Sequence, residues 1–171
     1  MDRPLAIFAT SVLLGFVTWS IVSATYVWPR LRTQARVQAL RPLLTLHSFR
    51  FIGLAFLVPG VVGPDLPAAF ARPAAYGDLV ASLLALSTLA TLHTRLGVFV
   101  AWVFNVWGTA DLLYAFYQGI LGVGVQPGQW GATYFIPTVV VPLLLITHGL
   151  MFAVLMRPDA TPQVGGPLYG P

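Results

Sequence analysis

Hydrophobic residues are grouped along the chain in five long runs, and the segments between them and at the two chain ends contain most of the Pro residues and charges. A helix that crosses a bilayer needs about 20 consecutive, mostly apolar residues, and each run is about that long. No run alternates apolar and polar positions, which argues against β-strands. The pattern therefore predicts an all-α fold, an integral membrane bundle of five transmembrane helices over Leu5–Trp28, Leu43–Val62, Pro73–Leu92, Leu96–Leu121 and Phe135–Met156.

Proline marks several of the predicted helix ends. Pro29 is expected to stop the first helix, Pro42 to open the second and Pro73 to occupy the first turn of the third. Residues 1–157 then form a single five-helix unit. Residues 158–171 are rich in Pro and Gly without a hydrophobic pattern, so they predict a disordered cytoplasmic tail.

The orientation follows from arginine. The segment between the first two helices holds Arg30, Arg32, Arg36 and Arg41, and such clusters stay on the cytoplasmic side of a membrane. Helix alternation then places the N-terminus outside and the C-terminus inside, with Arg157 also inside. We expect the lipid bilayer itself to be the main partner of the chain.

The amino-acid composition excludes several kinds of chemical site. Of 171 residues 57% are hydrophobic and 8% are charged, whereas a soluble domain carries about 25% charged residues. The chain contains no Lys, Glu or Cys, which excludes Schiff-base amines, Cys nucleophiles, disulfides and Glu-based di-metal sites. The clustered arginines indicate topology and no nucleic-acid partner. Exclusive use of Arg, with much Ala, Leu and Gly, suggests a bacterial protein, placed in the inner (cytoplasmic) membrane.

Three ionisable residues lie near the middle of separate runs: Arg50, Asp111 and His148. A charge at that depth costs several kcal/mol unless it is paired or hydrated, so such groups indicate function. From the rise of about 1.5 Å per residue, Arg50 and Asp111 come close enough to pair. His47 and Asn105 lie near the same depth, and Gly108 leaves space beside them.

We therefore expect a buried pocket formed by Arg50, Asp111, His148, His47 and Asn105, which binds or translocates a small amphipathic or anionic molecule. No residue is assigned a catalytic role, and no metal ligands are predicted. The alternative interpretation is an ion pair that only fixes helix packing. Pro142 is expected to bend the fifth helix and open the pocket, with the loop at 64–73 as its lid.

Asp78 and His93 are predicted to have simpler roles. Asp78 is expected in the first turns of the third helix, where a carboxylate satisfies free amides. The functional alternative places Asp78 at the outer mouth of the pocket. His93 is expected to cap the end of the third helix at the membrane interface, where it would be dispensable.

Two other function classes stay open. A redox subunit would use His47 and His148 as ligands of haem b, or would bind a quinone. An accessory subunit would stabilise a larger complex, with another membrane protein or a second copy of the chain as partner.

Three short segments carry a resemblance: HSFRFIGLAF, PDLPAAFARPAAYGD and NVWGTAD. Over roughly residues 43–115 the chain resembles small bacterial multi-pass inner-membrane proteins of unassigned function. The resemblance implies a bacterial multi-pass protein and assigns no catalytic role.

Overall fold

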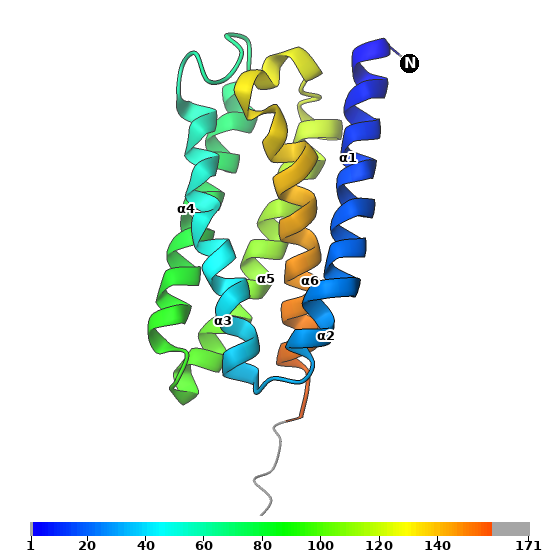
Figure 1. The fold of residues 1–171 in the computed structure, drawn as a ribbon. Coiled ribbons are helices and arrows are strands. Elements are labelled where there is room, and N and C mark those ends of the chain that lie inside the picture. Colours follow the sequence, from blue (N-terminus) through cyan, green and yellow to red (C-terminus); the bar gives the residue numbers. More distant parts are fainter. Residues whose placement is uncertain (1, 159–171) are drawn as a thin grey trace, which may run out of the picture.

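The computed structural model describes residues 2–158, which form helical rods lying side by side (Figure 1). Five of the helices are long and apolar enough to cross a membrane, which confirms the predicted number, and residues 2–158 contain no β-strand. The predicted tail, apart from Pro158, lies outside the described residues.

The first rod continues further than predicted. It consists of α1 (Arg3–Val22), the π-helical turn η1 (Ser23–Val27) and α2 (Trp28–Leu31). Pro29 was expected to stop the helix, but it occupies the start of α2. A proline is tolerated in a first helical turn because its missing N–H needs no partner there. The π turn before it shifts the hydrogen-bond register, so the rod can go on past Pro29.

The second rod starts earlier than predicted and changes its winding. It consists of α3 (Arg36–His47) followed directly by the 3₁₀ helix η2 (Ser48–Leu57). Pro42 lies inside α3 instead of opening it. The residues before Pro42 include Gln, Ala, Leu and Arg, which are strong helix formers, and this explains why the helix begins at Arg36 although these positions are partly polar.

The third and fourth rods form a hairpin. α4 (Ala68–Thr91) begins five residues before the predicted start, so Pro73 lies inside it. α5 (Arg95–Tyr117) begins after Thr94, whose side chain accepts a hydrogen bond from the amide of Gly97 (3.1 Å), and it ends in the π turn η3 (Gln118–Gly122).

The fifth rod has three parts: the 3₁₀ segment η4 (Pro127–Tyr134), the π turn η5 (Ile136–Val140) and α6 (Val141–Leu155). Pro142, in the first turn of α6, has no N–H to donate to the carbonyl of Thr138. Gly15 of α1 lies directly against that carbonyl. The indole N–H of Trp19 donates to the next carbonyl, Val139 (3.0 Å). The irregular start of the fifth rod thus provides the contact surface for α1.

The rods are unequal in how they pack. α4 contacts η2, α5 and α3, whereas α1 lies at the edge of the bundle and packs mainly on the fifth rod (Figure 1). Of the three apolar clusters that the described residues form in the interior, two are large. One includes Leu40, Leu44, Phe104 and Met151, and the other is aromatic, with Phe56, Phe70 and Trp130. Buried polar residues separate the two.

The two ends of the bundle differ in character. At the end where the N-terminus lies, the loop after η2 and the segment η4 hydrogen-bond to each other, through Gly63 N to Gln129 O (3.0 Å) and Ala132 N to Val61 O (2.7 Å). Gly131 adopts a φ of 54° in this contact, where a Cβ would collide with Val61. The loop predicted at 64–73 ends earlier than expected, because α4 already begins at Ala68, and its role as a lid stays a prediction.

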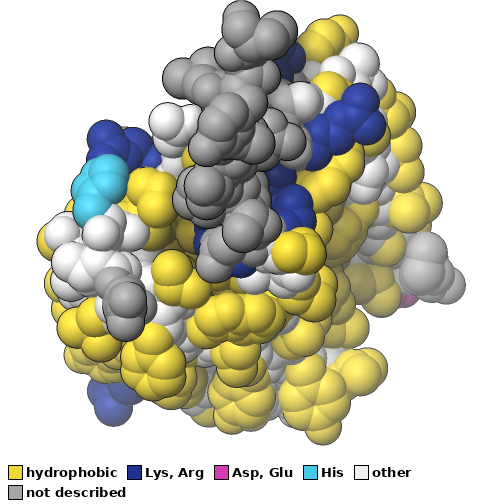
Figure 2. Space-filling view, turned by 90° about the horizontal axis from the view of Figure 1, so that it is seen from below, with side chains coloured by type: hydrophobic (Ala, Val, Ile, Leu, Met, Phe, Trp, Pro, Cys, Tyr) yellow, Lys and Arg dark blue, Asp and Glu magenta, His cyan; other side chains and the backbone are white. Residues whose placement is uncertain are grey.

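Arginines gather at the opposite end, which we call the arginine end (Arg30, Arg32, Arg36, Arg41 and Arg157). Arg157 donates to the carbonyls of Leu31 (3.1 Å) and Arg32 (2.9 Å), and Arg36 donates to the carbonyl of Arg157. Figure 2 views the molecule from this end and shows several Arg side chains on it. These bonds join the end of the last helix to the loop after the first.

Candidate functional site

Arg50 lies at the centre of the polar layer and is only 1% exposed. Its Nε and Nη2 both contact Oδ1 of Asp78 (2.7 and 2.6 Å), and its Nη2 also binds Oδ2 of Asp111 (2.6 Å). Its Nη1 donates to the carbonyl of Gly108 (3.1 Å). The predicted pairing of Arg50 with Asp111 is therefore present. We call Arg50, Asp78 and Asp111 the ion cluster.

Asp78 is the main departure from the sequence prediction. It was expected to satisfy free amides at the start of the third helix, but α4 begins at Ala68, which moves Asp78 into the third turn. Its side chain is 12% exposed and its partner is Arg50. It lies beside Arg50 in the interior of the bundle. The extra helical turns before Pro73 are what bring the carboxylate to this depth.

The 3₁₀ winding of η2 places Arg50 in the site. In a 3₁₀ helix, residues three apart lie on the same face, one above the other. The buried residues of η2 are Arg50, Gly53 and Phe56, and His47 precedes them with the same spacing. An α-helix would turn each successive member of this series by about 60° away from the last. The 3₁₀ form keeps all four on the face that meets α4, α5 and α6.

Three glycines provide the space for these polar side chains. Any Cβ at Gly53 would overlap the carboxylate of Asp78, and any Cβ at Gly77 would overlap that of Asp111. A Cβ at Gly108 would lie 2.6 Å from Cε1 and 2.7 Å from Nε2 of His148. The sequence indicated space at Gly108, and side chains of His148 and Arg50 fill it.

Asn105 orients His148. Nδ2 of Asn105 donates to the backbone carbonyl of His148 (3.3 Å), which leaves Oδ1 of Asn105 to accept from Nδ1 of His148 (2.6 Å). Nδ1 of His148 therefore carries the proton. Nε2 of His148 is buried, and its lone pair has no hydrogen-bond partner in the described structure.

His47 is oriented in the same way. The hydroxyl of Thr147 donates to backbone carbonyls one turn earlier, so its oxygen accepts from Nε2 of His47 (2.9 Å). Nδ1 of His47 is then a second buried nitrogen whose lone pair has no hydrogen-bond partner among residues 2–158. The two rings, which we call the histidine pair, contact each other with centroids 4.2 Å apart.

This contact tests the haem hypothesis. Bis-histidine ligation places the iron and the porphyrin plane between two imidazoles, with Fe–N distances of about 2 Å on each side. Rings with centroids 4.2 Å apart leave no space for a macrocycle between them. His47 and His148 therefore do not fit a haem held by both. Within residues 2–158, no group of three or more His, Cys, Asp or Glu side chains is arranged to hold a metal ion.

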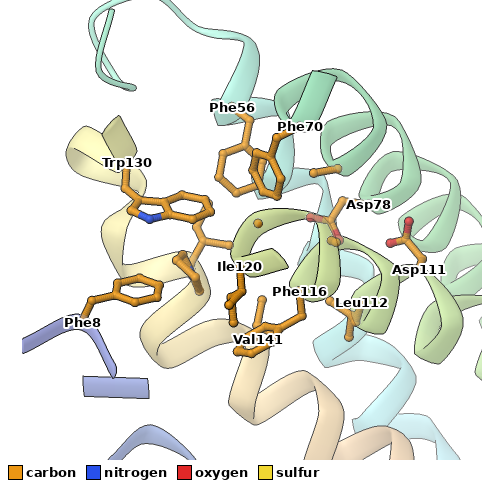
Figure 3. Close-up of a pocket in the computed structure, with 15 residues that line it drawn as sticks. Phe8, Phe56, Phe70, Asp78, Asp111, Leu112, Phe116, Ile120, Trp130 and Val141 are labelled. Carbon is orange, nitrogen blue, oxygen red and sulfur yellow. The ribbon is translucent and has the colours of Figure 1, made fainter. Parts of the chain in front are cut away.

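A cavity adjoins the ion cluster on the side of the N-terminal end. Its volume is about 40 Å³, and we call it the aromatic cavity. In Figure 3, rings of Phe8, Phe56, Phe70 and Trp130 face it, with the carboxylate groups on the other side. Trp130 packs edge-on against Phe70, with centroids 5.1 Å apart, and stacks on Phe8 at 6.0 Å. Its buried indole N–H has no partner in the described part of the chain.

Sequence reasoning missed this aromatic wall. None of these four aromatic residues was predicted to line the site. Phe56 had a signal, since it follows His47, Arg50 and Gly53 with a constant spacing of three. Phe8 and Trp130 had none, because they are 122 positions apart and meet only through the packing of α1 on the fifth rod.

His93 lies apart from the site. It follows α4 at the arginine end, is exposed, and its Nε2 lies 2.6 Å from Nη2 of Arg41. This agrees with its prediction as a residue at the helix end.

The comparison with known families gives one match. The family described as "Domain of unknown function (DUF8737)" matches residues 7–156, which include all five long helices except their outermost residues. The chain therefore belongs to this family. No curated protein and no solved structure matches the chain.

Proposed function

We propose that this member of the DUF8737 family is a bacterial inner-membrane protein whose five helices span the bilayer, and that it binds and translocates a small amphipathic molecule in the aromatic cavity. One observation carries the proposal: an apolar cavity ends at a buried ion cluster that contains two carboxylates and one guanidinium. Apolar walls with a few converging polar groups are typical of small-molecule sites.

Surface composition supports the membrane location. Large apolar side chains lie exposed along α1, α5 and η3, among them Leu13, Leu14, Phe99, Leu113 and Leu121. Exposed apolar area on this scale is stable only when lipid or another apolar surface covers it. The arginine end supports an orientation with this end in the cytoplasm and the N-terminus outside. The Arg-only basic composition supports a bacterial source.

A ligand site explains the ion cluster better than packing alone. A pair that only fixed two helices would need one carboxylate for Arg50, and each further charge at this depth adds a cost of several kcal/mol. Asp78 and Asp111 are both present, and both line the cavity. A polar group that faces open space is available to a ligand.

In this conformation a ligand can approach the ion cluster only from the N-terminal half of the bundle. Between the histidine pair and the arginine end, Leu40, Leu44, Phe104 and Met151 are completely or almost completely buried and close the interior. The aromatic cavity lies on the other side of the ion cluster. Binding from the N-terminal half is therefore the first step of the proposed activity, and translocation requires these four side chains to separate.

The contact between His47 and His148 is compatible with quinone binding but not with a haem held by both residues. Quinone binding stays a prediction. An accessory subunit is the alternative if the cavity binds nothing.

Binding can be tested with three probes that share one apolar body and differ in the head group: phenylbutylamine, phenylbutanol and phenylbutyrate. The purified full chain in lipid nanodiscs is titrated with each by calorimetry. Ala115 lines the cavity on α5, and Ala110 lies exposed on the same helix. We expect at least one probe to bind wild type and Ala110→Phe but not Ala115→Phe. Binding of none of the three to wild type would refute the proposed function and leave the accessory-subunit interpretation.

A further inference from the structure

The charges of the site point to a particular ligand class. We propose that the aromatic cavity takes the head group of a monovalent organic ammonium ion, which enters sideways from the bilayer beside α1 and displaces a proton from the carboxylate pair. This inference rests on the proposed function and specifies its ligand.

The ion cluster holds one carboxylate more than it holds cations. Arg50 is shared by Asp78 and Asp111. Its neighbours from the other helices add no positive charge, because His47 and His148 each have one hydrogen-bonded N–H and one bare nitrogen. A second proton on His148 would place a cation beside Arg50, since Nε2 of His148 and Nη1 of Arg50 lie within 2.7 and 2.9 Å of one point at Gly108.

One negative charge therefore remains for Asp78 and Asp111 to share, and an unbalanced charge in an apolar interior is strongly unfavourable. It is neutralised by one proton when the cavity is empty, or by one bound cation. An ammonium ion that enters releases that proton to solvent, so the charge of the site stays the same.

The lining of the cavity selects against an anion. Asp78 and Asp111 both line it, whereas Arg50 does not. Three positions on Arg50 already donate to acceptors of the protein: Nε to Asp78, Nη2 to Asp111 and Nη1 to Gly108. Oδ2 of Asp78 and Oδ1 of Asp111 accept no hydrogen bond from the described residues, so they are free to accept from an ammonium group. An anionic head group would meet two carboxylates.

The walls suit the same ligand. A cation within about 6 Å of an aromatic ring is stabilised by the ring face, and the effect grows when water is excluded. Phe56, Phe70, Phe116 and Trp130 surround the cavity next to the carboxylates (Figure 3). Trp130 is only 4% exposed and its indole N–H has no partner in residues 2–158, so it can also donate to a hydroxyl or ether oxygen on the ligand.

The apolar part of the ligand can lie outside the aromatic cavity. The cavity of about 40 Å³ holds little more than a head group. A second, apolar groove of about 410 Å³ lies between α1 and the end of α5, and it shares Phe8, Phe116, Gly119 and Ile120 with the cavity. We call it the lateral groove. Since α1 lies at the edge of the bundle, the groove leads from the lipid-facing side to the carboxylates.

The charge preference is tested with the same probes in nanodiscs. We expect phenylbutylamine to bind at least about tenfold more tightly than phenylbutanol, which corresponds to about 1.4 kcal/mol, and phenylbutyrate to bind most weakly. Asp111→Asn leaves Arg50 balanced by Asp78, so the preference for the amine should disappear. The exposed Asp65→Asn is the matched control and should keep it.

Proton exchange has its own readout. Phenylbutylamine stays protonated from mildly alkaline to mildly acidic buffer, so a pH effect reports the protein. We expect its affinity to fall as the pH is lowered, and its binding heat to change with the ionisation enthalpy of the buffer as a proton is released. Both effects should vanish in Asp111→Asn. Equal or tighter binding of the alcohol, or a binding heat independent of the buffer, would overturn the inference while the proposed function stands.

Entry beside α1 is tested by narrowing the lateral groove. Ala9 lines it, whereas Ile7 faces away on the same helix with 54% exposure. Ala9→Trp should weaken phenylbutylamine at least about fivefold relative to Ile7→Trp, a difference of about 1 kcal/mol. Equal affinities in the two variants would show that the groove holds a lipid chain or nothing, and that the body of the ligand lies elsewhere.

Discussion

The guanidinium of Arg50 binds two carboxylates and a backbone carbonyl at once, so three helices depend on a single side chain. Asp78 comes from α4, while Asp111 and the carbonyl of Gly108 come from α5. Arg suits this role because its planar fork presents several donors in fixed directions and keeps its charge when buried.

Removal of the positive charge of Arg50 should strongly destabilise the folded protein. Arg50→Leu leaves two buried carboxylates without a partner, and we expect a loss of about 3–5 kcal/mol in the free energy of unfolding. The triple variant with Asp78→Asn and Asp111→Asn contains no buried charge in the cluster and should recover most of that loss. Thermal unfolding in detergent measures both, with the exposed Arg72→Leu as control. A triple variant no more stable than Arg50→Leu would contradict this account.

The bond between Asn105 and His148 gives a second prediction. Asn105→Leu leaves the buried Nδ1–H of His148 without an acceptor, which should cost about 1–3 kcal/mol. In a His148→Phe background the same change should cost less, because the donor is already absent. The double-mutant cycle is measured by thermal unfolding, and strictly additive effects would show that the two side chains do not interact.

At the scale of elements, the site depends on close packing between helices. The 3₁₀ winding of η2 aligns Arg50, Gly53 and Phe56 on one face, and glycines on three helices leave room for the charged side chains that cross between them. A 3₁₀ run of this length is uncommon, because its hydrogen bonds are poorer than those of an α-helix. The contacts of Arg50 with α4 and α5 compensate for that cost.

Gly108 should therefore tolerate no side chain. The Cβ of Gly108→Ala would come within 2.6–2.9 Å of His148 and Arg50, and we expect a destabilisation of about 1–3 kcal/mol. Gly149 is the matched control, since it lies in α6 with open space at its Cβ position. Gly149→Ala should be neutral or stabilise by up to about 1 kcal/mol, as alanine favours helix. If thermal unfolding shows the same change in stability for Gly108→Ala and Gly149→Ala, the close contact at Gly108 is ruled out.

For the whole molecule, the asymmetry of its two ends predicts an orientation in the proposed membrane. Arg30, Arg32, Arg36, Arg41 and Arg157 lie at one end, whereas Arg3, at the start of α1, and Arg72, near the start of α4, lie toward the other. Because clustered arginines are retained on the cytoplasmic side, the C-terminus should be cytoplasmic and the N-terminus external.

A C-terminal fusion tests this orientation in bacterial cells. Green fluorescent protein fused after Pro171 should fluoresce, and alkaline phosphatase fused at the same place should be inactive, because each folds on only one side of the membrane. Fusions in the loop at 64–66 should give the reverse result. An active phosphatase at the C-terminus would invert the proposed topology.

Part of the fold and the site could be predicted from local sequence. The five helices could, because long apolar runs are needed to satisfy the backbone in lipid. The pairing of Arg50 with Asp111 could also be predicted, because depth follows from the rise per residue. Asp78 was predicted at the pocket only as an alternative, and its contact with Arg50 could not be predicted, because Pro73 indicated a later start of the helix than Ala68.

The sequence by itself determined the all-α fold class, the number of long apolar helices, and the scarcity of charges that makes Arg50, Asp111 and His148 conspicuous. These features depend on composition and on spacing along one helix, so no knowledge of neighbours is needed. Only the tertiary structure decided that Asp78 shares Arg50, that the histidine pair is in contact, and that Phe8 and Trp130 form one wall of a cavity. Each of these depends on the rotation of one helix against another, which is set by contacts between residues far apart in the chain.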